Sequence, residues 1–172
     1  MLLTVERDGD RLRLSAPSLH FLTGNPLERL HDGGSVTYVL SVTLQAERGQ
    51  PRRVHLTRKV VFSYDLWEER FSVALAGASN RSASHLTADA AEAWCLDLLA
   101  LPVRATPAAE PFVVKLECSL PDEDAQPAEA PSRATFTALI DVFSRKARAA
   151  PPRWEAVSGS LRLADLKDTP RK

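Results

Sequence analysis

The chain contains few residues whose types and spacing suggest chemistry. Its four histidines lie at positions 20, 31, 55 and 85, without the short H-x3-H or C-x2-C pairs that supply zinc ligands. His31 beside Asp32, with His20 upstream, is the nearest approach to an acid–base or metal-binding group. The missing local pairing favours a structural role for these residues, so we expect no resident metal.

The two cysteines, Cys95 and Cys118, fall on the apolar faces of predicted elements. We expect two buried free thiols that behave as small apolar groups. A disulfide between a helix and a strand is the alternative if the domain is exported, because disulfides persist in oxidising compartments. A catalytic thiol has less support, since no neighbouring base or oxyanion motif accompanies either cysteine.

No short motif of a known catalytic or cofactor-binding class is present. The chain lacks a P-loop, a dinucleotide fingerprint, G-x-S-x-G and H-E-x-x-H. We therefore expect no cofactor and favour a non-enzymatic binding domain. A hydrolase-type enzyme that uses His20, His31 and Asp32 stays open as an alternative, because many enzymes carry no short motif.

The most distinctive polar and aromatic cluster is Tyr-Asp-Leu-Trp-Glu-Glu-Arg at residues 64–70. A tight turn accounts for it, with Asp65 bonded to its own backbone and Trp67 covering the end of a sheet. The alternative is an exposed recognition loop, because Trp, Tyr and Arg often dominate protein interfaces. In that interpretation Tyr64, Trp67 and Arg70 contact the partner.

Basic residues form two runs in the sequence. The first run consists of Arg48, Arg52, Arg53, Arg58 and Lys59, and the second of Arg145, Lys146, Arg148 and Arg153. On alternating strand positions such charges usually keep a sheet face solvated. The alternative is a patch for an anionic lipid or an acidic partner, in which Arg53 and Lys59 extend the interaction surface. We expect no nucleic acid, because the aromatic platforms of single-strand binders are missing.

Composition is that of an ordinary globular protein. The chain has 172 residues, 44% of them hydrophobic and 26% charged, and 22 basic residues balance 22 acidic ones. A net charge of zero gives no global attraction to nucleic acid or anionic membrane. We expect one globular domain at residues 1–166 and a flexible tail at residues 167–172.

The sequence leaves the cellular compartment open. No apolar run approaches the ~20 residues of a membrane helix, so we expect no transmembrane segment. Residues 1–7 lack the charged region and apolar core of a signal peptide. The chain is then either cytoplasmic or an exported domain whose leader has been removed, and peripheral membrane contact is compatible with both.

Residues 35–75 carry the clearest structural pattern. Over residues 35–47 apolar and polar side chains alternate almost without a break, which is typical of a strand with one buried face. The alternation continues over residues 54–64, where Arg58 interrupts the apolar row, and over residues 71–75. Short turns between these segments predict an antiparallel meander of three strands. The inward row of its first strand is Val36, Tyr38, Leu40, Val42, Leu44 and Ala46.

Other segments extend this β architecture. Residues 2–16 predict an opening hairpin, because they centre on the turn-forming pair Asp8-Gly9. Residues 112–120 alternate again, and residues 154–166 contain a final strand.

A helix is predicted over residues 87–101, after an exposed connection at residues 77–85. Its apolar side chains recur at i, i+3, i+4 and i+7, the pattern of an amphipathic helix. Thr87 is the expected N-cap, and Pro102 is the expected stop. One helical turn is also predicted at residues 25–30.

A second helix is predicted over residues 132–148, after an acidic, proline-rich loop at residues 121–131. If both helices lie against a sheet, an apolar pocket between helix and sheet would suit a small apolar ligand or a lipid. The lining of that pocket would be Trp94, Leu98, Phe136 and Phe143.

Two motifs in the meander resemble those of a bacterial family. They are Gly-Ser-Val-Thr-Tyr-Val-Leu at residues 34–40 and Phe-Ser-Tyr-Asp-Leu-Trp-Glu-Glu-Arg-Phe-Ser-Val at residues 62–73. Their order resembles domain of unknown function 4390, and residues 113–120, 136–143 and 154–163 are similar in order. Members are usually predicted to be exported, so the resemblance implies a place in the cell envelope. It implies no catalytic residue.

These observations predict a mainly β fold. We expect a two-sheet antiparallel sandwich of about seven strands with two peripheral helices. The alternative is an α+β arrangement with both helices on one face of a single curved antiparallel sheet. The favoured function is a non-enzymatic interaction domain of the bacterial envelope whose partner is another protein. The alternatives are a carrier of a small apolar ligand or lipid, and a hydrolase-type enzyme.

Overall fold

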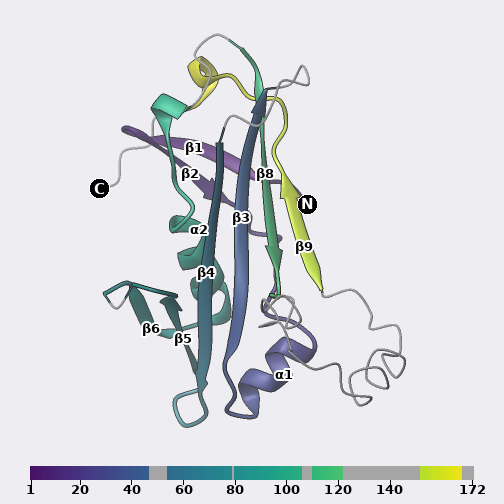
Figure 1. The fold of residues 1–172 in the computed structure, drawn as a ribbon, viewed down its shortest axis with the longest axis vertical. Coiled ribbons are helices and arrows are strands. Elements are labelled where there is room, and N and C mark those ends of the chain that lie inside the picture. Colours follow the sequence, from purple (N-terminus) through teal and green to yellow (C-terminus); the bar gives the residue numbers. More distant parts are fainter. Residues whose placement is uncertain (47–53, 79, 106–109, 122–151, 168–172) are drawn as a thin grey trace, which may run out of the picture.

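The computed structural model describes residues 1–46, 54–78, 80–105, 110–121 and 152–167 (Figure 1). Within these ranges nine strands form two antiparallel sheets, accompanied by two α-helices and two 3-10 turns. The predicted mainly β fold with two sheets is therefore confirmed. A single curved sheet, the alternative, is wrong, because β1, β2 and β7 pair with one another and form their own sheet.

The larger sheet has six strands in the order β6-β5-β4-β3-β8-β9. Their bounds are Val36–Ala46 for β3, Val54–Asp65 for β4, Arg70–Leu75 for β5, Ser82–Leu86 for β6, Phe112–Ser119 for β8 and Arg153–Val157 for β9. The predicted meander is confirmed, since β3, β4 and β5 are consecutive antiparallel neighbours.

Strict alternation places one row of β3 in the core. Every second residue from Val36 to Ala46 is buried, as the sequence pattern predicts, and Val60 and Phe62 continue the buried surface on β4. The opposite face is more polar and more exposed. There Thr43 Oγ1 lies 2.9 Å from His55 Nδ1, which accounts for one of the scattered histidines.

The smaller sheet has three strands in the order β1-β2-β7, with bounds Thr4–Asp8, Arg11–Ser15 and Leu101–Pro102. Its hairpin turns at Gly9, whose φ of 59° is left-handed backbone that glycine adopts without steric cost. The predicted opening hairpin is thus confirmed. Leu3 N donates to Val157 O at 3.1 Å, so the N-terminal segment also joins the small sheet to β9.

Helix α2 spans Ala88–Asp97 and begins where the sequence predicts. The Thr87 side chain accepts a hydrogen bond from Ala90 N at 3.3 Å, which satisfies one free N–H of the first turn. The helix ends earlier than expected, because Leu98 is its C-cap and Leu101 joins β7 instead.

Helix α1 spans Asn25–His31 and extends the predicted helical turn at residues 25–30. Pro26 stands in its first turn, where a missing N–H breaks no helical bond. The 3-10 turns are η1, Val103–Ala105, and η2, Leu163–Asp165. The predicted loop at residues 121–131, apart from Pro121, and the predicted helix over 132–148 lie outside the described residues.

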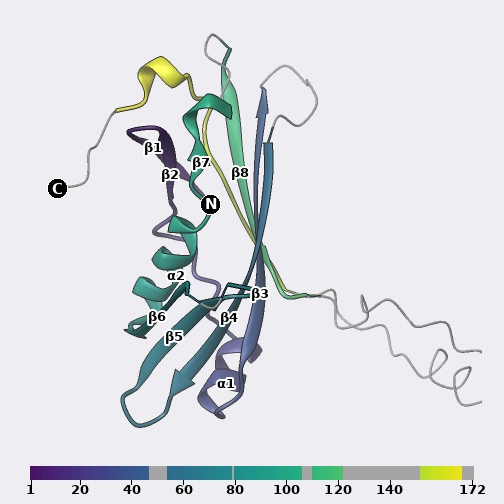
Figure 2. The same cartoon turned by 60° about the vertical axis from the view of Figure 1, so that its left-hand side comes forward.

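Helix α2 and the small sheet lie on the same side of the large sheet, as Figure 2 shows. One hydrophobic core fills the space between these layers and draws buried side chains from both sheets and from α2. Its centre is aromatic: Phe21 lies 5.1 Å from Tyr38, 5.9 Å from Phe62 and 6.4 Å from Trp154 between ring centroids. No helix within the described ranges is long and apolar enough to cross a membrane.

The expected exposed connection at residues 77–85 is wrong in its second half. Strand β6 begins at Ser82 and pairs with β5, with a register shift between Phe71 and Val73. Its residues are mostly small or polar and none is fully buried. Backbone hydrogen bonds to β5 therefore define this edge strand, and side-chain periodicity gives no signal for it.

Replacing Phe21 by alanine should destabilise the protein by about 3–5 kcal/mol, because the fully buried ring contacts three other aromatic rings. Urea unfolding of both chains, followed by circular dichroism, measures the change. A loss below about 1 kcal/mol would contradict this aromatic centre of the core.

Candidate functional site

The turn between β4 and β5 presents the most exposed large apolar side chains of the described residues away from the N-terminus. Trp67 is 96% exposed and Leu66 is 56% exposed. Burying surface of this kind against a partner is favourable, and an aromatic ring supplies much of it from a single residue. The turn is therefore the candidate binding site.

Hydrogen bonds hold the turn in one conformation. Asp65 Oδ1 accepts from Trp67 N at 2.8 Å and from Glu68 N at 3.1 Å. Glu69 has a φ of 52°, so the chain reverses through left-handed backbone before Arg70 pairs with Asp65 across the two strands. The sequence prediction that Asp65 bonds its own backbone is confirmed, whereas Trp67 points into solvent instead of covering the sheet end.

Aromatic side chains support the base of the turn. Tyr64 lies 4.8 Å from Phe71 and 4.5 Å from His31 between ring centroids. The Glu68 carboxylate contacts His85 Nδ1, which links the turn to β6. The backbone below Trp67 is thus supported by α1 and by β6.

The electrostatics of the turn are dominated by carboxylates. Hydrogen bonds from the backbone N–H groups of Glu68 and Trp67 lower the pKa of Asp65, because they stabilise its charged form. Glu68 and Glu69 add negative charge, which Arg70 offsets in part. The surface around the exposed Trp67 ring is therefore acidic overall.

The other residues predicted for this surface do not gather beside the turn. Lys59 is exposed on the outer face of β4, six residues before Asp65, which corresponds to roughly 20 Å along a strand. Arg53 lies outside the described residues. Arg58 lies on the opposite face of β4 from Lys59, so alternation divides the predicted basic run between two faces.

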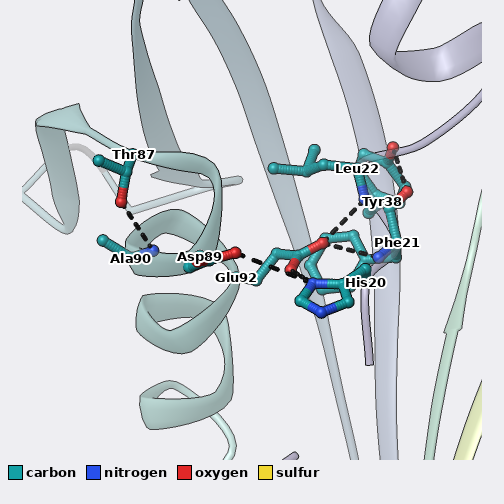
Figure 3. Close-up of polar contacts among 8 residues, drawn as sticks. All are labelled: His20, Phe21, Leu22, Tyr38, Thr87, Asp89, Ala90 and Glu92. Carbon is teal, nitrogen blue, oxygen red and sulfur yellow. Dashed lines mark hydrogen bonds and ion pairs between the residues drawn. The ribbon is translucent and has the colours of Figure 1, made fainter. Parts of the chain in front are cut away.

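A second group of polar residues joins the segment before α1 to α2 (Figure 3). Glu92 Oε2 lies 3.0 Å from His20 Nδ1, and Glu92 Oε1 accepts from Phe21 N at 2.7 Å and Leu22 N at 2.9 Å. His20 Nδ1 also lies 3.9 Å from Asp89 Oδ1. One histidine and two carboxylates within 4.8 Å of one another have the residue types of a metal site.

The hydrogen bonds of Glu92 favour a structural role for this group. Its side chain is 7% exposed, and both carboxylate oxygens already have protein partners. Tyr38 adds a further bond to the same segment by donating its hydroxyl to Phe21 O at 3.1 Å. Together these bonds fix residues 20–22 against α2 and β3, which inserts Phe21 into the core.

The predicted trio of His20, His31 and Asp32 does not form one cluster. The group of metal-ligand types around His20 contains Asp89 and Glu92 and excludes His31 and Asp32. The His31 ring contacts the Tyr64 ring at an interplanar angle of 52°, and Asp32 is the C-cap of α1. The histidines therefore have separate environments, as a structural role predicts.

The residues of the expected apolar pocket are placed in part. Trp94 and Leu98 are half-buried and pack against the core, whereas Phe136 and Phe143 lie outside the described residues. Cys95 and Cys118 are buried free thiols, as expected. Burial raises the pKa of both thiols, so neither supplies a thiolate near neutral pH.

Sequence reasoning did not identify Glu92 as a partner of His20. The available signal is an acidic residue on the inner face of a predicted amphipathic helix, next to Ala91 and one turn before Cys95. A buried carboxylate needs hydrogen-bond donors. The sequence does not say which donors, because the backbone N–H groups that fill this need are about 70 residues away.

Comparisons of the chain with protein-family models, with curated proteins and with solved structures gave no match. The resemblance to domain of unknown function 4390 consequently stays a prediction from the two meander motifs.

Replacing Glu92 by alanine should destabilise the protein by about 2–4 kcal/mol, because two buried N–H groups lose their acceptor. Glu92→Gln should cost about 1 kcal/mol, since an amide oxygen still accepts both bonds. Asp89→Ala is the matched control, because its side chain is 86% exposed, and it should change stability by less than about 0.5 kcal/mol. Equal losses in all three variants, measured by urea unfolding, would contradict the assignment.

The turn should loosen at low pH, because Asp65 has a lowered pKa in the folded state. Its stabilisation is complete above the ordinary aspartate value of about 4 and is lost as the pH falls through the folded-state pKa. Asp65→Asn keeps an acceptor oxygen without the charge and should remove this pH dependence. A carboxyl titration by nuclear magnetic resonance measures the midpoint, and a midpoint at or above the ordinary value would refute the expectation.

Proposed function

We propose that this protein is a non-enzymatic binding domain that recognises another protein through the β4–β5 turn. The observation that carries the proposal is an almost fully exposed Trp67 on a turn in which the backbone N–H groups of Trp67 and Glu68 are hydrogen-bonded to the Asp65 side chain. An exposed apolar ring on a loose loop would lose much conformational entropy on binding. Here most of that ordering is already present in the free protein.

Tryptophan is among the residues that contribute most to protein interfaces. Inserted into a partner pocket, the Trp67 ring and the neighbouring Leu66 side chain would bury most of the apolar surface that the turn exposes. Arg70 lies beside them and can donate several hydrogen bonds to partner carboxylates or carbonyls. This set of an aromatic anchor with a polar rim is typical of a hot spot.

The charge of the turn indicates the kind of partner. Asp65, Glu68 and Glu69 outnumber Arg70, so an anionic lipid surface would repel this part of the molecule. An apolar protein pocket with a basic rim is complementary to it. A place in the cell envelope follows from the family resemblance and forms part of the same proposal.

The geometry offers less support to a hydrolase. The carboxylate beside His20 is buried and accepts two backbone N–H bonds, which leaves little capacity to take part in proton transfer. The His31 ring contacts the aromatic rings of Tyr64 and Phe71. The two thiols are buried, with raised pKa values.

Site-directed photo-cross-linking tests the proposal. Benzoylphenylalanine replaces Trp67 in the full chain, which is expressed in its native host. The cells are irradiated and the protein is then purified. We expect one dominant protein adduct, identified by mass spectrometry, and a large drop in its yield when Arg70→Ala is added. Trp67→Ala alone should change stability by less than about 0.5 kcal/mol, because the ring buries almost nothing.

The matched control places the same cross-linker at Leu2, another exposed apolar residue, which is 69% exposed and lies near β9. This position should not yield the adduct. Identical adducts from both positions, or no adduct from position 67, would overturn the proposal.

A further inference from the structure

A cleft of about 850 Å³ opens where the small sheet, α2 and the first half of β4 meet. Five arginines line it: Arg7 of β1, Arg11 of β2, Arg58 of β4, Arg104 of η1, and Arg81 from the connection between β5 and β6. No lysine lines it, and the acidic side chains are Asp10 and Asp97. The lining therefore has three positive charges in excess, although the whole chain is neutral.

The carboxylates of the described residues do not pair with these five arginines. Within the described residues no carboxylate oxygen forms an ion pair with any of the five within 4.0 Å. Asp97 is directed to Arg13, which lies 3.5 Å away and also pairs with Asp8 at 2.9 Å. The Arg7 side chain donates to Gly9 O and the Arg58 side chain donates to Thr57 O, and both acceptors are neutral carbonyls.

The position of Arg58 shows that the cleft belongs to the interior face of the sheet. Alternation places its side chain between Leu56 and Val60, on the face of β4 that forms the core. A half-buried guanidinium in an apolar row loses hydration, and this loss is compensated when an anion binds beside it. Leu98 and Val103 give the cleft an apolar wall near these charges.

Strand pairing explains why the space is open. β5 pairs with β4 only from Val60 onward, so within the described residues the stretch from Val54 to Arg58 pairs with β3 alone. On the other side, Val103 N donates to Asp10 O at 2.8 Å and fixes η1 to the turn of the β1–β2 hairpin. The β1–β2 turn and η1, fixed to each other, therefore line the cleft together with the part of β4 that β5 leaves unpaired.

We propose that this cleft binds a small ligand carrying several phosphate or carboxylate groups. The guanidinium group presents its N–H donors in a planar fork that matches the oxygens of both anions, and arginines from different elements can bind separate anionic groups of one molecule. The site is distinct from the β4–β5 turn and does not rest on the proposed protein partner.

Isothermal titration of the full chain with two probes tests the inference. Inositol hexakisphosphate and mellitate place six phosphates or six carboxylates around a six-membered ring, so the pair separates the two anion chemistries. We expect 1:1 saturable binding of at least one probe at constant ionic strength and a higher melting temperature in its presence. Arg58→Gln and Arg104→Gln should each weaken binding about tenfold or more.

Arg153→Gln is the control, because Arg153 is an exposed arginine at the start of β9 and does not line the cleft. It should bind the probes as the wild type does. Thermal unfolding of every variant shows that each is folded before its titration is compared. Saturation by neither probe would overturn the inference, and so would equal weakening by Arg153→Gln and Arg58→Gln.

Discussion

The architecture depends on one buried carboxylate. Glu92 accepts the backbone N–H groups of Phe21 and Leu22, and this interaction ties an irregular segment to α2 on the inner side of the large sheet. Without it the segment would leave two buried donors unpaired. With it, Phe21 completes an aromatic centre that contacts β3, β4 and β9. Residues 20–22, which belong to no strand or helix, thereby connect α2 to the large sheet.

Much of the fold follows from local sequence patterns. Alternation over β3 correctly gives its buried row, and Thr87 gives the start of α2. The first hairpin is also predicted, although its turn is Gly9-Asp10, one residue later than the Asp8-Gly9 pair. Each of these signals acts within a few residues, through side-chain direction, turn conformation or capping. Sequence reasoning works for them because neighbours along the chain decide the outcome.

The remaining features need contacts between distant parts of the chain. The side chains of β6 are mostly polar or small and show no alternation, so the sequence does not predict its backbone pairing with β5. Trp67 lies in a turn that the sequence does predict, but its exposure depends on how α1 and β6 surround that turn. The five arginines of the cleft come together only because two sheets and a helix end converge. These arginines are spread over positions 7 to 104, so no short segment of the sequence predicts the cleft.

Strand β4 connects the two candidate binding surfaces and sets the distance between them. It carries Arg58 in the cleft and ends at Asp65 in the turn, which places them roughly 20 Å apart on one continuous strand. A small molecule in the cleft and a protein on the turn would not compete for space. If both proposals hold, the two ligands would be bound at once, at a spacing set by one continuous strand.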